Sequence, residues 1–206
     1  MGRQIEEFER VVAALADRGF RPSLRHLANS GGLLAEPRTH FDMVRPGLVL
    51  YGGLASPVLA DRVRLRPVMQ LRASVLQVKE IPAGHGVGYG STHRMATDGR
   101  IAVLHLGYAQ GVARALSNRG TAILRGRPAP ILGLVSMDHT TVDASAIPDV
   151  RVGDEAILWG SDAEGNDVMS VARLAGTIGY ELLTGVPQAV PRSYLTDDVA
   201  RSAHRA

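Results

Sequence analysis

Apolar residues recur at helical spacing over the first 18 positions of the chain, with glutamate and arginine between them. This pattern predicts an amphipathic helix over residues 3–18 that buries one face. Gly19 follows, and glycine is typical of the position that ends a helix. The apolar positions are Ile5, Phe8, Val11, Val12 and Leu15.

Two short segments, residues 22–28 and 41–47, predict strands on either side of a short helix. The first segment leads into Asn29-Ser30-Gly31-Gly32, which combines turn residues with a helix start, and the second closes with Pro46-Gly47. This alternation of helices and strands is typical of an α/β repeat. In (β/α)8 barrels the last two loops frequently bind a phosphate through backbone N–H groups and hydroxyls. The two glycine-bearing loops, with their one serine, suit that task.

The pattern changes near residue 60, and from Val68 onward apolar segments alternate with turns. Regular spacing of this kind predicts a small β-domain. One helix is predicted inside it, over residues 170–176, with Ser170 as its N-cap. Polar residues 197–206 are expected to fray. The predicted strands are 68–78, 101–106, 121–124, 131–136, 140–143, 155–159 and 190–195.

One stretch of the predicted β-domain has the character of a functional turn. The apolar run Ile101–Leu106 reads as a buried strand and is followed by Gly107-Tyr108-Ala109-Gln110-Gly111. Two glycines let the backbone turn sharply and approach another group closely. The tyrosine between them would be held at the end of a strand, where its phenol can be aimed. The alternative is an ordinary turn with a core tyrosine.

Composition narrows the class of protein. At 206 residues the chain is long enough for one large domain or two small ones. It has no cysteine, which fits a cytoplasmic protein, and no apolar run long enough to span a membrane. The net charge is only +3 and the arginines are scattered, so a nucleic-acid surface is not favoured. No metal site is expected. Lys79 is the only lysine.

Five short motifs, taken together, resemble the C-terminal half of bacterial alanine racemases. The resemblance implies α/β architecture followed by mainly β structure: the last strands and helices of a (β/α)8 barrel in residues 1–65, then a C-terminal β-domain in residues 66–206. It also implies a pyridoxal-phosphate-dependent isomerase that interconverts L- and D-alanine and supplies D-alanine for peptidoglycan. The motifs lie within residues 26–30, 43–48, 107–111, 135–138 and 176–181.

The resemblance also implies which residues meet the substrate. Tyr108 would be the base that takes the α-proton of L-alanine, and in a head-to-tail homodimer it would reach the partner's barrel. Racemisation requires a second base on the opposite face of the substrate, and a phenol serves as a base only where nearby cations favour the phenolate. The backbone N–H of Met137 would bind the substrate carboxylate. Asp138 would line the entrance.

A second group of residues would hold the cofactor. Ser30, the backbone of Gly47 and Leu48, and Tyr180 would bind its phosphate, in agreement with the phosphate loops inferred above. Arg45 would face the pyridine nitrogen; an arginine keeps its proton, so that nitrogen would stay unprotonated. His26 would support Arg45 by a hydrogen bond. Arg45 in a surface ion pair, and His26 as a merely structural histidine, are the alternatives that the residues alone leave open.

The chain departs from the family pattern at three places. Gln110 stands where the family usually has aspartate, and Ala113 where it usually has proline. Leu134 stands where the family usually has an arginine that helps to gate the substrate channel. This last change keeps open a broad-specificity racemase, for example one acting on serine.

The cofactor's Schiff-base lysine is the largest departure. In the family it lies near the start of the barrel, and Lys79 lies in the predicted β-domain, outside any phosphate-loop context. We therefore expect a truncated gene product, a metagenomic fragment or one piece of a split enzyme, inactive alone. The alternative of another class is a non-catalytic fragment or subunit that packs against a barrel from another polypeptide.

Overall fold

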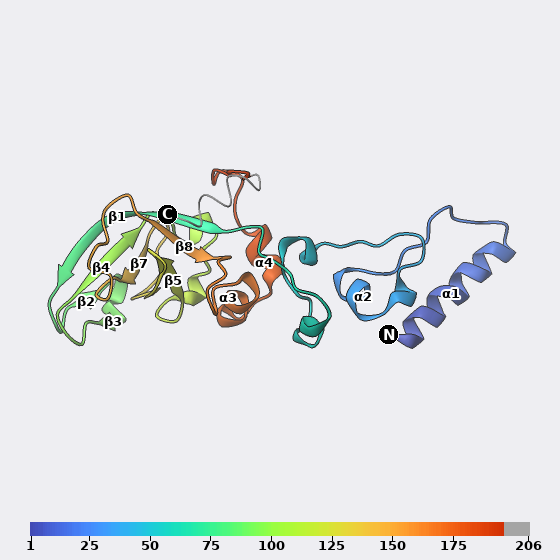
Figure 1. The fold of residues 1–206 in the computed structure, drawn as a ribbon, viewed down its shortest axis with the longest axis horizontal. Helices are drawn as coiled ribbons and strands as arrows, with labels where there is room; N and C mark the ends of the chain where they lie inside the picture. The colour runs from blue at the N-terminus through green and yellow to red at the C-terminus, as the bar shows by residue number, and fades with distance from the viewer. Residues whose placement is uncertain (196–206) are drawn as a thin grey trace.

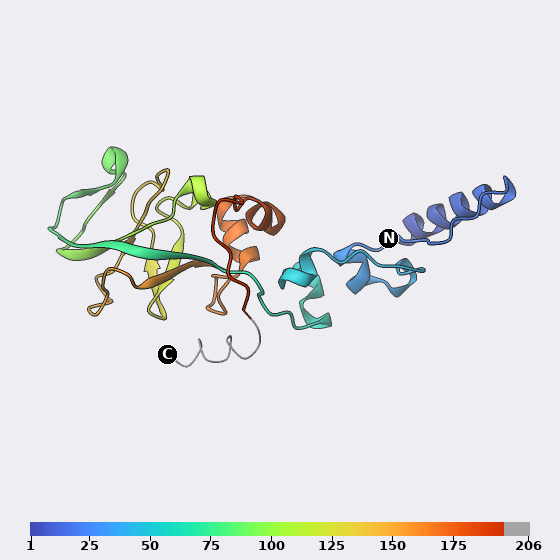
Figure 2. The same ribbon diagram turned by 90° about the horizontal axis from the view of Figure 1, so that it is seen from above.

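A computed structural model of the chain describes residues 1–195, which form two parts arranged end to end (Figure 1). An antiparallel sheet lies at one end, the N-terminal helix lies at the other, and helices α3 (Val168–Ala175) and α4 (Gly179–Thr184) lie between them. The view at right angles shows the same elongated arrangement (Figure 2). The extended segment between residues 63 and 70 joins the two parts.

The N-terminal part consists of one long helix followed by short ones. The predicted first helix is confirmed as α1 (Gly2–Asp17), which ends before Gly19 at φ +81°. Asn29 caps α2 (Ser30–Ala35), since its side chain accepts a hydrogen bond from the Gly32 N–H. Three 3₁₀ helices follow: η1 (Pro37–Thr39), η2 (Leu48–Tyr51) and η3 (Pro57–Arg62).

The prediction of strands over residues 22–28 and 41–47 is wrong, because neither segment forms a strand in the structure. One isolated parallel bridge, between Asn29 and Arg45, joins the two segments. The Arg45 N–H donates to the carbonyl of Ala28 at 2.9 Å beside it. A strand requires a continuous ladder of bonds to a neighbour. Here the backbone bonds between the segments are few and separated: Asp42 N–H donates to Arg25 O at 3.0 Å and Arg45 N–H to Ala28 O at 2.9 Å, whereas the Ala28 N–H donates to Thr39 O instead.

The same segments are tied by an ion pair that responds to acid. The Asp42 carboxylate accepts from Arg25 Nε at 2.8 Å and from the Arg25 backbone N–H at 2.9 Å. The side-chain hydrogen bond from Arg25, reinforced by the backbone one, lowers the pKa of Asp42 from 3.8 to about 2. A carboxyl whose pKa falls on folding stabilises the fold above its unfolded pKa, and this contribution is lost as pH falls through the folded value.

We therefore expect the ion pair between Arg25 and Asp42 to open as pH falls through about 2, while its contribution to stability declines between about 3.8 and 2. The measurement is the NMR shift of the Arg25 amide and Nε–H, which should titrate with the Asp42 carboxyl. The Asp42→Asn variant is the control and should remove this titration. A titration that persists in the variant would show that another group is responsible.

The C-terminal part is a six-stranded antiparallel sheet with strand order β6-β5-β8-β1-β4-β7. A bridge between Ile131 and Val142 connects the segment after β6 to the far edge strand β7, so the sheet is nearly barrel-like. Its strands are β1 (Leu71–Ile81), β4 (Gly99–Leu104), β5 (Thr121–Leu124), β6 (Arg127–Pro130), β7 (Thr140–Asp143) and β8 (Glu155–Trp159); β2 (Gly86–Val87) and β3 (His93–Arg94) form a separate hairpin.

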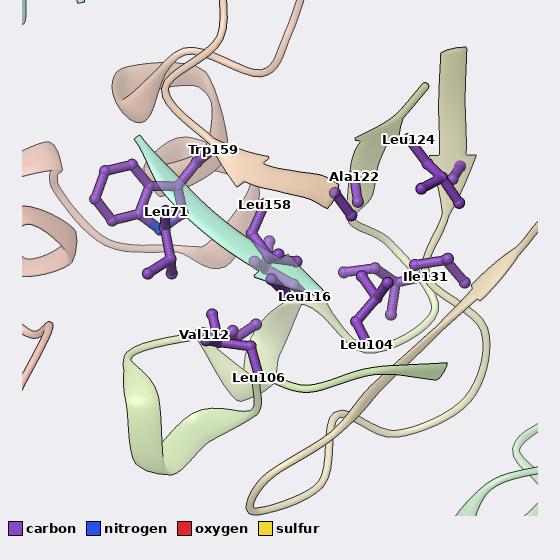
Figure 3. Packing of buried hydrophobic residues seen from close by; sticks show 14 of the residues in the cluster. Leu71, Leu104, Leu106, Val112, Leu116, Ala122, Leu124, Ile131, Leu158 and Trp159 are labelled. Atoms are coloured by element: carbon purple, nitrogen blue, oxygen red, sulfur yellow. The ribbon is translucent and has the colours of Figure 1, made fainter. Parts of the chain in front are cut away.

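The core lies inside this curved sheet. Leu104, Leu124 and Leu158 are at most 2% exposed, and Figure 3 shows them among the other buried side chains between the strands. Trp159, on the last strand, lies beside Leu71 at the end of the sheet nearest α3 (Figure 3). Burial of this apolar surface is the main stabilising term for the β-domain.

Several local predictions in this part are corrected by the structure. Asp167, not Ser170, caps α3: its carboxylate accepts from the Met169 and Ser170 N–H groups at 3.0 Å. Burial raises the pKa of Asp167, but the hydrogen bonds from Ser170 and Met169 outweigh it, so that the pKa is lowered. Residues 131–136 form only the bridge at Ile131, and residues 190–195 form no strand. The fraying expected for residues 197–206 lies outside the described residues.

Candidate functional site

The two loops predicted to bind a phosphate lie side by side. Ser30 is 2% exposed, and its Oγ accepts hydrogen bonds from the N–H groups of Gly47 at 3.0 Å and Val49 at 3.4 Å. Within residues 1–195 the structure gives the Leu48 N–H no hydrogen-bond acceptor. A hydroxyl and an uncommitted backbone donor therefore meet at one place, which we call the Ser30 cup (Ser30, Gly47, Leu48 and Val49). This donor set fits a phosphate.

A methionine joins the Ser30 cup to α4. Leu48 is 2% exposed, and a Cβ placed on Gly53 would lie 2.7 Å from its Cδ1 and 3.3 Å from the Met169 sulfur. A Cβ on Gly179 would lie 2.4 Å from the same sulfur. Met169 thus fills a space that two glycines leave open. The Cβ position of Gly179 also lies 3.7 Å from Leu48 Cδ1, so the start of α4, where Tyr180 follows Gly179 with 42% of its surface exposed, is packed on the Ser30 cup.

Arg45 and His26 lie beside the parallel bridge of the N-terminal part. Arg45 Nη1 is 2.6 Å from His26 Nδ1 and donates to the His26 carbonyl at 3.4 Å. An arginine always donates, so His26 Nδ1 is the acceptor and its proton lies on Nε2. The guanidinium is thereby held at one edge, while both residues remain exposed.

The Tyr108 turn (residues 107–111) is packed against the loop Ser136–Asp138. The Tyr108 N–H donates to Ser136 O and the Ala109 N–H to Met137 O, each at 3.0 Å. The approach is so close that a Cβ on Gly107 would lie 2.2 Å from Ser136 O. Gly111, at φ +99°, ends the turn with a conformation that favours glycine. The turn displays Tyr108 with 44% of its surface exposed.

The loop beneath the Tyr108 turn carries both other residues predicted to meet the substrate. Met137 is 55% exposed, and the structure gives its N–H no hydrogen-bond acceptor in residues 1–195. The carboxylate of Asp138 accepts a hydrogen bond from Gln110 Nε2 at 2.8 Å. The phenol of Tyr108, the free donor of Met137 and the Asp138 carboxylate therefore belong to one surface of the β-domain.

Tyr108 and the Ser30 cup do not meet within this chain. Tyr108 lines an open groove of about 500 Å³ together with Arg114, Thr177 and Glu181. No residue of the Ser30 cup lines that groove, and no hydrogen bond within residues 1–195 joins Tyr108 to Ser30 or Arg45. Helices α3 and α4 lie between the sheet and the N-terminal part (Figure 1).

Sequence reasoning missed three features of this region: helix α4, the role of Met169, and the contact of Gln110 with Asp138. Helix α4 has six residues and begins at a glycine, which gives little periodic signal. Met169 and Gln110 act on residues distant in sequence, and their partners cannot be read from spacing. Lys79 lies on β1, away from the Ser30 cup.

No group of three or more His, Asp or Glu side chains in residues 1–195 is arranged to hold a metal ion. No helix among these residues is long and apolar enough to cross a bilayer.

Comparison with known proteins gives consistent matches over almost the whole chain. Residues 68–194 match the family model for the alanine racemase C-terminal domain, and residues 1–55 match that for the alanine racemase N-terminal domain. An alanine racemase of Symbiobacterium thermophilum is 42% identical over 194 residues, which cover 93% of this chain and 51% of that protein. One from Salinispora arenicola is 44% identical over the same shares of both chains. The chain spans about half the length of the curated relatives it matches.

Solved structures match equally well. The alanine racemase of a D-cycloserine-producing Streptomyces lavendulae superimposes with a TM-score of 0.86 at 39% identity, covering 94% of this chain and 51% of that one. The alanine racemase of Bartonella henselae, solved with covalently bound pyridoxal phosphate, superimposes with a TM-score of 0.81 at 34% identity, covering 94% and 52%.

Proposed function

Because this chain belongs to the alanine racemase family, we propose that it supplies part of the active site of a pyridoxal-phosphate-dependent enzyme that interconverts L- and D-alanine. The observation that carries the proposal is that one chain of this family contains both the Ser30 cup and the Tyr108 turn. One presents phosphate donors, and the other presents an exposed phenol on a turn that is bonded to the loop carrying the Met137 N–H. The product D-alanine would serve peptidoglycan synthesis in the cytoplasm.

The Ser30 cup would hold the phosphate of pyridoxal phosphate. The Ser30 hydroxyl and the Leu48 N–H offer donors, and Gly47 leaves room beside them since a Cβ there would meet nothing within 4 Å. The hydroxyl of Tyr180 would complete the phosphate site. Arg45, held by His26, would face the pyridine nitrogen and keep it unprotonated. When bound, the cofactor withdraws electrons from Cα of the amino acid.

The Tyr108 turn would act on the substrate. Tyr108 would remove the α-proton of L-alanine, and a base on the opposite face would return a proton to give D-alanine. The Met137 N–H, free of protein acceptors within residues 1–195, would bind the substrate carboxylate. Asp138 would line the entrance. Each residue keeps the role that its position in the motif implies.

The separation of Tyr108 from the Ser30 cup supports a shared site between two copies. We place residues 1–65 in a (β/α)8 barrel and residues 66–206 in the C-terminal β-domain. In a head-to-tail homodimer the Tyr108 turn of one copy would reach the barrel of the other. The exposure of Tyr108 beside an open groove is consistent with such a contact.

A chimera tests the proposal. Residues 1–206 are joined to the part of the Symbiobacterium thermophilum relative that this chain does not cover, and conversion of L- to D-alanine is measured with a D-amino-acid oxidase. We expect racemisation by the chimera and none by residues 1–206 alone, because the only lysine lies on β1. A folded chimera that binds the cofactor but leaves alanine unchanged would contradict the proposal.

The Ser30→Ala chimera tests the cofactor site separately. It removes the hydroxyl that would donate to the phosphate, and a hydrogen bond to a charged group contributes about 1.5–3 kcal/mol. We expect half-saturation to require about tenfold more pyridoxal phosphate, measured by cofactor absorbance. Ser193→Ala, at an exposed position in the same chain, is the control. Equal cofactor affinity in all three proteins would remove Ser30 from the phosphate site.

Leu134 favours a second candidate, a racemase of broader specificity that also accepts serine. Its side chain is only half-buried and apolar, whereas the family usually has an arginine at this position. A panel of L-amino acids offered to the same chimera distinguishes the two. Preference for serine over alanine would favour this alternative. The remaining hypothesis, a non-catalytic subunit, predicts cofactor binding without turnover of any amino acid.

A further inference from the structure

The side chain of Gln110 connects the two loops that carry Tyr108 and Met137. Its Oε1 accepts a hydrogen bond from the Gly107 N–H at 2.9 Å, which closes the Tyr108 turn. Its Nε2 donates to Asp138 Oδ1 at 2.8 Å, across 28 positions of sequence. Gln110 is half-buried, so these bonds are partly shielded from water. Both polar ends of one side chain are therefore engaged.

The chemistry of the link requires an amide at position 110. A primary amide accepts at one end and donates at the other, whereas a carboxylate only accepts. An aspartate or glutamate could take the Gly107 N–H but would present a second negative charge to Asp138. The two other bonds between the loops, from Tyr108 N–H to Ser136 O and from Ala109 N–H to Met137 O, join backbone atoms alone. Gln110 supplies the side-chain bond from the turn to Asp138.

We propose that Gln110 is a positioning residue that fixes the Tyr108 turn on the Ser136–Asp138 loop and thereby sets the phenol relative to the Met137 N–H. The effect of Gln110 on the reaction rests on the proposed function, whereas its hydrogen bonds to Gly107 and Asp138 are a property of the chain itself. Gln110 would touch neither substrate nor cofactor. Its effect reaches the reaction through Tyr108 and Met137.

Exchange of donor and acceptor tests the link in residues 1–206. Gln110→Glu keeps the acceptor for Gly107 and loses the donor to Asp138, so we expect amide hydrogen exchange at Gly107 and Ala109 to rise about tenfold, the size of a lost charged hydrogen bond. Asp138→Asn keeps an acceptor and should change exchange less than twofold. The double variant, which combines both substitutions, places an amide at position 138 that can donate to the carboxylate at position 110, and exchange should return to the original rate.

Two further proteins keep the outcome decisive. Gln110→Met is uncharged and nearly isosteric but can make neither hydrogen bond. We expect it to raise amide exchange at Gly107 and Ala109 as Gln110→Glu does. Gln77→Glu, at an exposed position of β1, makes the same chemical change where residues 1–195 offer the side chain no hydrogen bond, and it should leave exchange unchanged. Exchange at Ala102 in β4 reports whether each variant is folded.

The phenol is followed directly by fluorine NMR of 3-fluorotyrosine protein, with the Tyr108 resonance assigned from Tyr108→Phe. We expect it to shift or broaden in Gln110→Glu and to recover in the double variant. Unchanged exchange and an unchanged Tyr108 resonance in both Gln110 variants would overturn the proposal, as would failure of the double variant to recover. In the chimera, Gln110→Glu should lower kcat more than it changes cofactor affinity. These NMR results stand even if the chimera racemises nothing.

Discussion

Tyr108→Phe is expected to lower racemisation by the chimera about 10²–10⁴-fold, the usual contribution of a general base. Phenylalanine keeps the ring, and Tyr108 is 44% exposed with its backbone held by Ser136, so the fold should be unaffected. Cofactor absorbance should be unchanged, because the residues proposed to hold the cofactor do not include Tyr108. Tyr194→Phe, at an 89% exposed position, is the matched control and should keep full activity.

Comparing kcat/KM from L-alanine with kcat/KM from D-alanine cannot show on which enantiomer Tyr108 acts as the base. L- and D-alanine have the same free energy in solution, so kcat/KM must fall equally from either enantiomer. The specific signature is exchange of the α-hydrogen in D₂O. We expect Tyr108→Phe to lose exchange from L-alanine and to retain it from D-alanine, whose proton the base on the other face removes. Equal loss of exchange from both enantiomers would show that Tyr108 is not the base for L-alanine.

Gly107→Ala is expected to destabilise the β-domain by about 1–3 kcal/mol, as overpacking of a closed contact does. A Cβ here would lie 2.2 Å from Ser136 O and 2.4 Å from Met137 O, and both are backbone atoms that cannot rotate away. The φ of Gly107 is −139°, ordinary for any residue, so the cost is steric rather than conformational. Relief requires the Tyr108 turn to lift from the Ser136–Asp138 loop, which would also displace the phenol.

Urea unfolding and amide exchange at Ala109 measure this effect in residues 1–206, and racemisation measures it in the chimera. Gly2→Ala is the control, because a Cβ on Gly2 meets nothing within 4 Å. At temperatures where both proteins are fully folded, we still expect Gly107→Ala to racemise alanine more slowly than the unsubstituted chimera. Full activity with an unchanged midpoint of unfolding would mean that the turn tolerates a side chain and that its packing does not position Tyr108.

The β-domain could be predicted from the sequence because its strands carry their own pattern. Ile101–Leu104 and Glu155–Trp159 are bounded by turn residues and pair with neighbours in the same domain. The N-terminal segments at 22–28 and 41–47 have strand-like composition, but strand formation depends on neighbours, and the described residues offer one bridge. Similarly, Asp167 and Ser170 are both good caps, and only the backbone geometry decides between them.

The candidate site divides in the same way. Ser30 with Gly47, and Tyr108 between two glycines, have local signatures that point to their chemistry. The Arg45–His26 pair depended on the family resemblance, since 19 positions separate the two residues. The bond from Gln110 to Asp138 had no signature, because a glutamine in a turn is ordinary until the fold brings a carboxylate to it.

The packing of Met169 between two glycines restricts which substitutions can accumulate at these positions during evolution. Gly53 and Gly179 lie far apart in the chain, yet each is confined by Met169, and Gly53 also by Leu48. A side chain at either glycine is tolerable only if Met169 shortens, and a shorter residue at 169 leaves a hole unless a glycine gains a methyl group. These positions should therefore covary among homologues. Recombination that takes α3 and α4 from one parent and the Leu48 turn from another would separate partners that evolved as a set.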